Sequence, residues 1–224
     1  MNPIDRRKLL QSAAVIAATA VLPACAQAED NGNTPNRASA ASASASSSNT
    51  VKTGGWARVK TLLIVSHPYP DQSVMIKGLQ QAAETVDNVT VRNLESIYGF
   101  DSRAIDGEAE RRITREHDRI VFMFPTHWFN ITPMMKAYLN DTWGSVGPGL
   151  WQGKEMLIIT TAAGGGSTYG KNGRIGVPLA DVFLPMKASA LHAGMIYLPP
   201  LAFEGVTPSR LGEYQRQVVE QLTR

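Results

Sequence analysis

Three stretches of the chain carry residue types that together could hold a flat molecule with an anionic tail. The first spans residues 67–75, His-Pro-Tyr-Pro-Asp-Gln-Ser-Val-Met, where a turn-rich loop leads into a helical pattern that Ser73 could cap. Because the free amides and the dipole at the start of a helix attract anions, a phosphate could bind at Ser73, Val74 and Met75. Taken alone, a serine at this place is more often only a helix cap.

The second stretch is Pro-Thr-His-Trp-Phe at residues 125–129, which follows the apolar run Ile-Val-Phe-Met-Phe at residues 120–124. Such a run predicts a strand that is buried on both faces. Trp128 and Phe129 lie just beyond its end, where large aromatic side chains are costly to leave in water. Either the core folds over these two side chains or a flat ligand covers them.

The third stretch is Thr-Thr-Ala-Ala-Gly-Gly-Gly-Ser-Thr-Tyr at residues 160–169. Consecutive small residues let a backbone approach a planar ligand closely and leave amide groups free to bind its polar edge. By itself this run would fit a flexible surface loop equally well. The joint occurrence of the three stretches, and not any one of them, favours a binding site.

The order of strands and helices predicts where these stretches meet. Strand patterns at residues 59–65, 89–94, 120–124, 155–161 and 194–198 alternate with helical patterns at residues 74–86, 108–116, 131–143, 179–193 and 208–222. This alternation predicts an α/β fold with a flavodoxin-like sheet of five parallel strands, in the order 2-1-3-4-5, and helices on both faces. Ligands of such sheets bind beyond the carboxyl ends of the strands, where all three stretches would lie.

Composition argues against several other classes of function. Two of the three net positive charges come from residues 5–8, Asp-Arg-Arg-Lys, so the rest of the 224-residue chain is nearly neutral. No basic stripe interleaved with aromatic residues indicates nucleic-acid binding. The single cysteine, Cys25, excludes an intrachain disulfide. The four histidines, His67, His117, His127 and His192, are too scattered along the chain to predict a metal site.

Residues 1–25 have the pattern of an export signal. Arg6 and Arg7 precede a moderately apolar run that is too short to span a bilayer comfortably, and they resemble a twin-arginine signal. The run ends in Leu-Pro-Ala-Cys, which is similar to a bacterial lipoprotein box with Cys25 as the lipidated residue. An ordinary cleaved signal with an incidental cysteine is the alternative.

Residues 26–57 are rich in alanine and serine and predict a flexible tether ahead of a folded domain at residues 58–224. Together with the export signal, the tether predicts a protein held at the periplasmic side of a membrane by a lipid anchor only. A cytoplasmic protein is the alternative.

Residues 60–222 resemble the flavodoxin-like NAD(P)H:quinone oxidoreductases, a family that includes the bacterial ancillary flavoproteins of potassium-efflux systems. The resemblance rests on His67-Pro68-Tyr69-Pro70 with Ser73, on Pro125-Thr126-His127-Trp128-Phe129 with Pro133 and Lys136, on Gly153-Lys154, and on Thr160-Thr161 with Gly164-Gly165 and Tyr169. It implies a homodimer with the site at the subunit boundary. It also implies a flavin cofactor, either FMN or FAD, and the short segment after the last strand favours FMN.

The resemblance also assigns roles to individual residues. His67, Gln72, Ser73, Val74 and Met75 would hold the ribityl phosphate end of the cofactor; Pro125, Thr126, His127, Trp128 and Phe129 would wrap the isoalloxazine ring; and Thr161, Ala163, Gly164 and Gly165 would offer backbone contacts to its polar edge. Tyr169, on the substrate side, and His127 are the candidate catalytic residues. Mammalian members have a histidine six positions after this tyrosine, where the present chain has Ile175, so their proton relay is not implied.

The implied activity is the transfer of a hydride from NADH or NADPH to flavin N5, and from there to a quinone or a similar flat acceptor. Two alternatives stay open. One is a flavin-loaded regulatory subunit that docks on a membrane transporter without turnover, and the other is a one-electron carrier, which should be acidic and leave its flavin edge bare. Because reduced nicotinamide is scarce outside the cytoplasm, the predicted export leaves the electron donor open.

Overall fold

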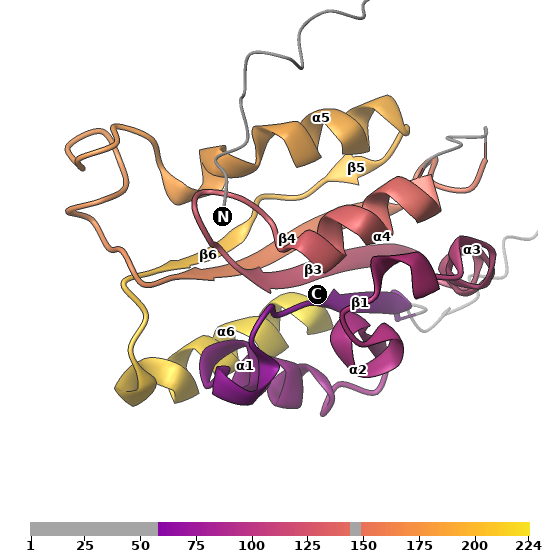
Figure 1. The fold of residues 1–224 in the computed structure, drawn as a ribbon, viewed down its shortest axis with the longest axis horizontal. Helices are drawn as coiled ribbons and strands as arrows, with labels where there is room; N and C mark the ends of the chain where they lie inside the picture. Colours follow the sequence, from indigo (N-terminus) through magenta and orange to yellow (C-terminus); the bar gives the residue numbers. More distant parts are fainter. Residues whose placement is uncertain (1–57, 144–148) are drawn as a thin grey trace, which may run out of the picture. The chain divides into compact units, whose positions relative to one another are not determined.

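Six parallel strands form the sheet at the centre of residues 58–143 and 149–224, the part of the chain that the computed structural model describes. The strands are β1 (Thr61–Val65), β2 (Val89–Asn93), β3 (Arg119–Pro125), β4 (Glu155–Ala162), β5 (Ile196–Tyr197) and β6 (Leu201–Glu204). Their order is β2-β1-β3-β4-β5, and β6 also pairs with β4 (Figure 1). The predicted flavodoxin-like sheet is confirmed, and the sixth strand is one that the sequence pattern does not reveal.

The edge of the sheet is divided into β5 and β6 because two prolines interrupt it. Of the strand expected at residues 194–198, only β5 is present, and the edge resumes after Pro199 and Pro200. Ile196 pairs with Glu155 whereas Leu201 pairs with Ile159, so the edge gains one residue relative to β4, as in a bulge. Proline has no amide hydrogen for the ladder, which confines it to edges and bulges.

Helices cover both faces of the sheet (Figure 1). α4 (Pro133–Trp143) and α5 (Leu184–His192) lie over one face, and α1 (Met75–Ala83) and α6 (Leu211–Thr223) lie over the other. The remaining elements are α2 (Leu94–Tyr98), α3 (Gly107–Arg115) and four short 3₁₀ turns at Pro70–Gln72, Ser102–Ala104, Leu179–Phe183 and Pro208–Arg210. Successive residues of β1 point to opposite faces of the sheet. Leu62 therefore belongs to the hydrophobic core beneath α4 and α5, and Leu63 belongs to the core beneath α1 and α6.

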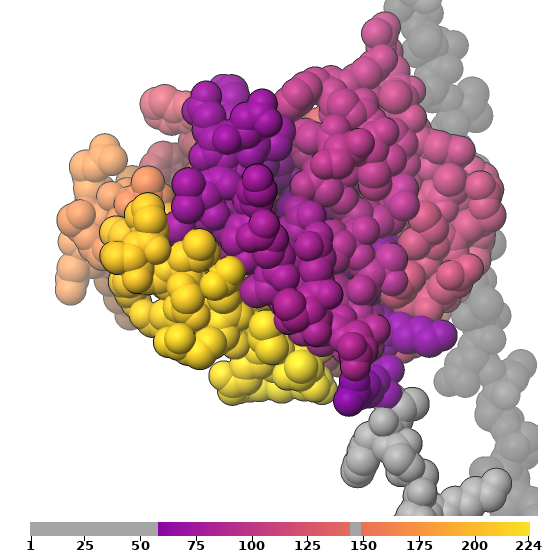
Figure 2. Space-filling model, turned by 90° about the horizontal axis from the view of Figure 1, so that it is seen from below, coloured from indigo at the N-terminus to yellow at the C-terminus, as the bar shows by residue number. Residues whose placement is uncertain are grey.

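A glycine allows α1 and α6 to pack closely. Figure 2 shows α1 in purple beside α6 in yellow. A Cβ atom at Gly78 would lie only 2.7 Å from Leu211 Cδ2, and Gln215 Nε2 donates a hydrogen bond to the Gly78 carbonyl at 2.9 Å. This contact fixes the position of α1, whose first residues border the predicted phosphate site.

Two helix starts differ from the sequence prediction. The expected strand at residues 89–94 stops at Asn93, which caps α2 by accepting a hydrogen bond from the Ser96 amide at 3.1 Å. At α1, Val74 and not Ser73 occupies the N-cap position. Ser73 Oγ nevertheless accepts a hydrogen bond from the Lys77 amide at 3.3 Å, so this hydroxyl still satisfies one backbone donor of the first turn.

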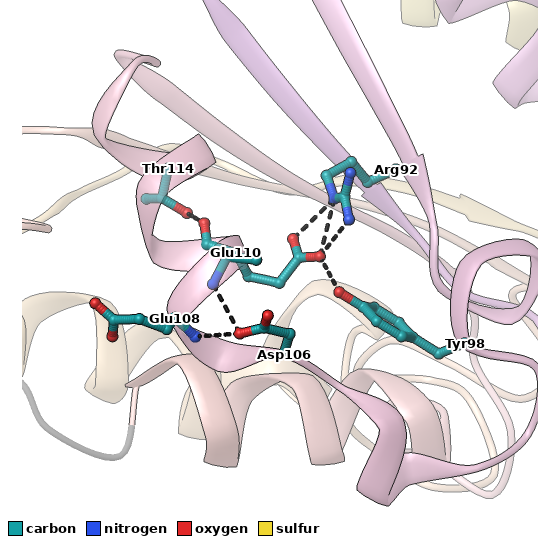
Figure 3. A network of polar contacts seen from close by, with 7 residues as sticks. Arg92, Tyr98, Asp106, Glu108, Glu110 and Thr114 are labelled. Atoms are coloured by element: carbon teal, nitrogen blue, oxygen red, sulfur yellow. Dashed lines mark hydrogen bonds and ion pairs between the residues drawn. The ribbon is translucent and has the colours of Figure 1, made fainter.

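A buried ion pair joins β2 to α3 (Figure 3). Arg92 Nε donates to the two carboxylate oxygens of Glu110 at 3.0 and 2.8 Å, and the Tyr98 hydroxyl donates to the same carboxylate. The Glu110 side chain is fully buried, whereas one fifth of the Arg92 side chain is exposed. Asp106 caps α3 by accepting hydrogen bonds from the amides of its first turn. The network therefore ties α2 and α3 to an edge strand of the sheet.

The expected export signal at residues 1–25, with its lipoprotein box at Cys25, and the expected tether at residues 26–57 lie outside the described residues. Among residues 58–143 and 149–224, none of the helices has the length and apolar character needed to cross a bilayer.

Candidate functional site

The carboxyl ends of β1, β3 and β4 bring the three chemically suggestive stretches together. The ring centroid of His127 lies 6.1 Å from that of His67 and 6.1 Å from that of Tyr69. On the other side, the rings of Phe129 and Tyr169 meet edge to face at 6.0 Å. The first stretch thus contacts the second, and the second contacts the third.

A tight turn at residues 127–130 holds two aromatic side chains outward. His127 and Asn130 exchange backbone hydrogen bonds of 3.3 and 3.0 Å across the turn. Between them, Trp128 and Phe129 have φ angles of 48° and 58°, the sign pattern of a type I′ turn, which glycine and asparagine normally occupy. Each such aromatic residue costs on the order of 1–2 kcal/mol. Strain of this kind is typical of ligand-binding turns.

The exposure of these side chains decides between the two explanations for them. Trp128 is 94% exposed and Phe129 is 40% exposed. The core of the described chain therefore does not cover Trp128, which leaves this side chain open to a flat ligand.

Threonines fix this turn relative to β4. The Thr126 amide donates to the Thr161 carbonyl at 2.8 Å, and the hydroxyls of Thr126 and Thr160 lie 2.8 Å apart. Thr161 and Pro125 are buried members of β4 and β3. Of the expected cofactor residues, these two therefore lie in the strands at the edge of the site and not in its loops.

The start of α1 offers free donors to an anion. Within the described residues, the amides of Val74, Met75 and Ile76 donate to no protein acceptor. The Ser73 hydroxyl, the nearest possible cap, accepts a hydrogen bond only from the Lys77 amide. Helix N-termini with such amides bind phosphate groups. The arrangement therefore fits the phosphate end of a flavin.

A cavity of about 320 Å³ opens beside these amides. His67, Ser73 and Lys77 are among its walls, and so is one acid, Asp71. Gln72 is exposed at its rim, and Met75 packs against the core, so only the amide of Met75 can contribute. Lys77 balances the charge of Asp71, and the neutral His67 ring, whose Nδ1 accepts from the Tyr69 amide, keeps Nε2–H as a donor for an anionic group.

The loop after β4 is shaped by its own glycines. A Cβ atom at Gly164 would lie 2.9 Å from Thr168 Oγ1, and the Gly165 carbonyl accepts hydrogen bonds from the amides of Thr168 and Tyr169 at 2.7 and 3.0 Å. Ala163, at the start of the loop, is exposed. The packing of the loop itself thus favours glycine at position 164, besides any approach of a ligand. This packing places Tyr169, which is 6% exposed, against Phe129.

His67 and His127 are neighbours in the fold, although their residue numbers differ by 60 and no spacing of histidines in the sequence predicts that they meet. His67 Nδ1 accepts a hydrogen bond from the Tyr69 amide at 2.9 Å, so the neutral ring carries its hydrogen on Nε2. Burial, and next the nearby His127, lower the pKa of His67. No group of three or more His, Cys, Asp or Glu side chains in the described part of the chain is placed to hold a metal ion.

The lowered pKa of His67 predicts a loss of stability in acid. The unfolded chain binds the proton near the ordinary value of 6.5, whereas the folded chain binds it only at lower pH. The free energy of unfolding should therefore fall as the pH drops through about 6.5. Urea unfolding across this range should show a shallower fall for His67→Asn, whose amide oxygen can replace Nδ1. The exposed His192→Asn serves as the control, and equal slopes for wild type and His67→Asn would contradict the prediction.

Two cavities at the opposite ends of the strands are larger than the cavity beside the start of α1. One of about 630 Å³ is bordered by Lys60, Arg92 and His117, and another of about 430 Å³ by Arg58 and Asp87. The last two side chains are about four-fifths exposed and pair with each other at 3.2 Å. Because ligands of open parallel sheets bind at the carboxyl ends of the strands, we place the site at the three loops and not here.

Not every residue of the expected motifs lies at the site. Lys154 lies at the amino end of β4, where its ammonium group donates a hydrogen bond to the His117 carbonyl, so its role is structural. Conversely, the sequence pattern did not single out Glu95, a buried carboxyl beneath the first loop. An acid in the first turn of a helix is ordinarily exposed, and no motif marks this one.

Comparison with known proteins places the chain. A family model described as a flavodoxin-like fold, Flavodoxin_2, matches residues 59–223. General stress protein 14 of Bacillus subtilis is 32% identical over 175 residues, which cover 71% of this chain and 98% of that protein. The uncharacterized NAD(P)H oxidoreductase YrkL of Bacillus subtilis is 30% identical over 63% of this chain and 83% of its own length. The potassium-efflux ancillary protein KefF of Klebsiella aerogenes is also 30% identical, over 63% of this chain and 80% of its own length.

Among solved structures, general stress protein 14 of Treponema denticola, in complex with FMN, superimposes with a TM-score of 0.67. It is 26% identical to this chain, and the match covers 73% of this chain and 97% of that one. All three loops of the site lie within the region that the family model matches.

Proposed function

The chain belongs to the flavodoxin-like NAD(P)H:quinone oxidoreductase family, and we propose that it binds FMN at the three loops and reduces a quinone or a similar flat acceptor with NADH or NADPH. One observation carries the proposal: the strained turn presents Trp128 to solvent beside helix-start amides that have no protein acceptor in the described chain. A relative solved with FMN supports FMN over FAD, and a relative named as an NAD(P)H oxidoreductase supports the nicotinamide donor.

Bound FMN would supply the chemistry, accepting a hydride at N5 and passing it to the acceptor. The protein would supply binding and orientation. The amides at the start of α1, with Ser73 and His67, would hold the phosphate, and Trp128 and Phe129 would lie against the ring. The backbone of Gly164 and Gly165 would face the polar edge of the ring, where amide donors stabilise negative charge.

The two candidate catalytic residues differ in their surroundings. Tyr169 is buried against Phe129, and burial, followed by the charge of Glu204, raises the pKa of its hydroxyl. That hydroxyl therefore stays protonated at neutral pH and can donate a hydrogen bond to an acceptor over the ring. His127 is exposed beside His67.

A homodimer and a lipid tether are part of the proposal. Leu184, Leu191 and Ile196 are each more than half exposed on α5 and the adjoining edge strand, and such apolar side chains support a partner there. A molecular mass from sedimentation would test the dimer. For the tether, we propose export by the signal at residues 1–25 and lipidation of Cys25, which Cys25→Ala should abolish, releasing the protein from membranes.

The activity is tested by mixing the purified, FMN-loaded protein with NADH or NADPH and a soluble quinone. We expect nicotinamide oxidation well above the rate given by the same concentration of free FMN. A rate equal to that of free FMN would contradict the enzymatic proposal. The donor that gives the higher kcat/KM also answers which nicotinamide is used.

A second candidate is a flavin-loaded regulatory subunit without turnover. It is favoured only by the relative KefF, which is named as an ancillary protein of a potassium-efflux system. The same assay separates the two candidates, because tight FMN binding without quinone reduction would support the regulatory function.

A further inference from the structure

A buried polar chain lies beneath the loops of the site and joins three segments. The Ser66 hydroxyl donates a hydrogen bond to Glu95 Oε1 at 2.7 Å, and Ser66 Oγ is also hydrogen-bonded to Thr132 Oγ1. The Met135 amide donates to Thr132 Oγ1 at 3.3 Å. The exposed fractions of Ser66, Thr132 and Glu95 are only 0, 1 and 7%. The chain links the loop after β1 to the starts of α2 and α4.

The direction of these hydrogen bonds follows from the donors available. Because the Ser66 hydrogen goes to Glu95, the Thr132 hydroxyl must donate to Ser66. Glu95 Oε1 is thus the terminal acceptor, so the hydrogen of a neutral carboxyl is carried by Oε2, which is buried and has no partner in the described part of the chain. Burial raises the pKa of Glu95, and a buried carboxyl without a cation is far less costly when neutral.

Apolar packing does not close this region from every side. Glu95 borders a cavity of about 200 Å³, together with Pro68 of the loop after β1 and with Pro133 and Met134 of α4. The two segments that carry His67 and the aromatic turn therefore meet across a void. Besides the ring contacts of His127 with His67 and Tyr69, the hydrogen bonds from Thr132 through Ser66 to Glu95 therefore help to set the separation of these segments.

We propose that Glu95, acting through Ser66 and Thr132, is a positioning residue of the cofactor site and acts as a neutral carboxylic acid. Ser66 directly precedes His67, and Thr132 follows the turn at residues 127–130 by two positions. This inference rests on the proposed function, because the positioned loops are those that would hold FMN. An ionised Glu95 would add an uncompensated negative charge beneath an anionic cofactor and would oppose its binding.

Few other groups near Glu95 can titrate or carry charge. On the loop after β1 the group is His67, and on α2 it is Tyr98, whose hydroxyl donates to Glu110. Beyond α2, Asp101 and Arg103 pair with each other at the surface at 3.1 Å. The start of α4, at residues 132–135, presents no charged side chain. His67 and the phosphate of FMN also carry titratable protons, so the test compares variants that share both.

The test measures the dissociation constant of FMN at about pH 6 and about pH 8.5 for wild type, Glu95→Gln and Glu95→Ala. Glutamine keeps the Oε1 acceptor and resembles the neutral acid, so E95Q should bind within about threefold of wild type at the lower pH. E95A should bind at least about tenfold more weakly at both pH values, since it leaves the Ser66 hydroxyl without its acceptor. Wild type should lose affinity more steeply than E95Q as the pH rises.

Each departure from this pattern overturns part of the proposal. Wild-type affinity in E95A would show that Glu95 positions nothing, and binding at about pH 6 that is more than about threefold weaker in wild type than in E95Q would show that Glu95 is not neutral there. If E95A does not fold, Thr132→Val replaces it, because valine keeps the volume and removes the hydroxyl. T132V should weaken FMN binding by a similar factor, and unchanged binding would overturn the proposal.

A cofactor-free measurement keeps this inference separate from the proposed function. If wild type binds no FMN, the proposed function fails, and amide hydrogen exchange of the protein without cofactor still decides the role of Glu95. Exchange at residues 67–73 and 126–132 should be faster in E95A or T132V and unchanged in E95Q. Equal exchange in all variants would overturn the positioning role, whereas faster exchange confined to the first two would support it.

Discussion

Replacing Trp128 by glycine is expected to weaken FMN binding by about tenfold or more and, at the same time, to stabilise the protein without FMN by about 1 kcal/mol. Binding weakens because the ring loses its stacking partner. The free protein gains because glycine adopts a φ of 48° without strain, while the 94% exposed tryptophan contributes little packing. Weaker FMN binding together with a larger free energy of unfolding would show that the strained conformation of Trp128 serves ligand binding and not the stability of the fold.

The two quantities are measured by titration of the FMN-free protein with FMN and by urea unfolding. Gln81→Ala is the control, because Gln81 is an exposed residue near the carboxyl end of α1, away from the three loops and from the proposed dimer face. It should change neither quantity appreciably. FMN affinity that is unchanged in Trp128→Gly, with the yellow colour kept after dialysis, would contradict the placement of Trp128 against the ring.

The Glu110→Ala variant should lose about 3 kcal/mol of unfolding free energy, the largest loss of stability expected of a single charged residue in the described chain. The substitution leaves the Arg92 guanidinium and the Tyr98 hydroxyl without their common acceptor in a largely buried place (Figure 3). A buried charge without its partner destabilises the folded state, because no interaction then offsets its desolvation. Chemical denaturation at neutral pH gives the difference directly.

Glu108→Ala is the control for this variant, because Glu108 lies on the same helix and also pairs with an arginine. Its side chain is 59% exposed in the pair with Arg111, so the loss should be much smaller than that of Glu110→Ala. Equal losses for the two variants would mean that the Arg92–Glu110 pair is not the element that ties α2 and α3 to β2.

Local patterns in the sequence were sufficient to predict the order of the five strands in the sheet. The apolar runs of β1, β3 and β4 are long and β-branched, and parallel strands with both faces covered leave few orders to choose from. Short elements carry too little periodic signal to be seen. The offset strand β6 and the five-residue α2 fall in this class, whereas β5 was expected but is shorter than the predicted strand at residues 194–198.

The site was predictable where its residues follow one another along the chain and not where the fold brings them together. The sequence of residues 125–129 predicts aromatic side chains at the site, but no sequence pattern predicts that the ring centroids of His67 and His127 lie 6.1 Å apart. Positive φ at Trp128 and Phe129 was equally hidden, because the sequence offers no glycine or asparagine at these two positions. Long-range packing imposes that turn against local preference, as happens at functional sites.

Burial also hides chemistry from sequence reasoning. Glu95 and Ser66 look like ordinary polar residues next to a strand end, and only the fold shows that they share a hydrogen bond of 2.7 Å away from water. The glycines of the loop after β4 illustrate the reverse case. Their presence suggested a ligand, and the packing of Gly164 against Thr168 accounts for part of the pattern without one.

The mass of the small molecule released when the purified protein is denatured tests the central claim most directly. The account predicts the mass of FMN, in an amount approaching one molecule per chain, because the start of α1 would hold one phosphate and the strained aromatic turn would hold one ring. Release of FAD would require room for a second phosphate and an adenosine and would revise the cofactor. No flavin in the released material, and no uptake of added FMN, would contradict the account.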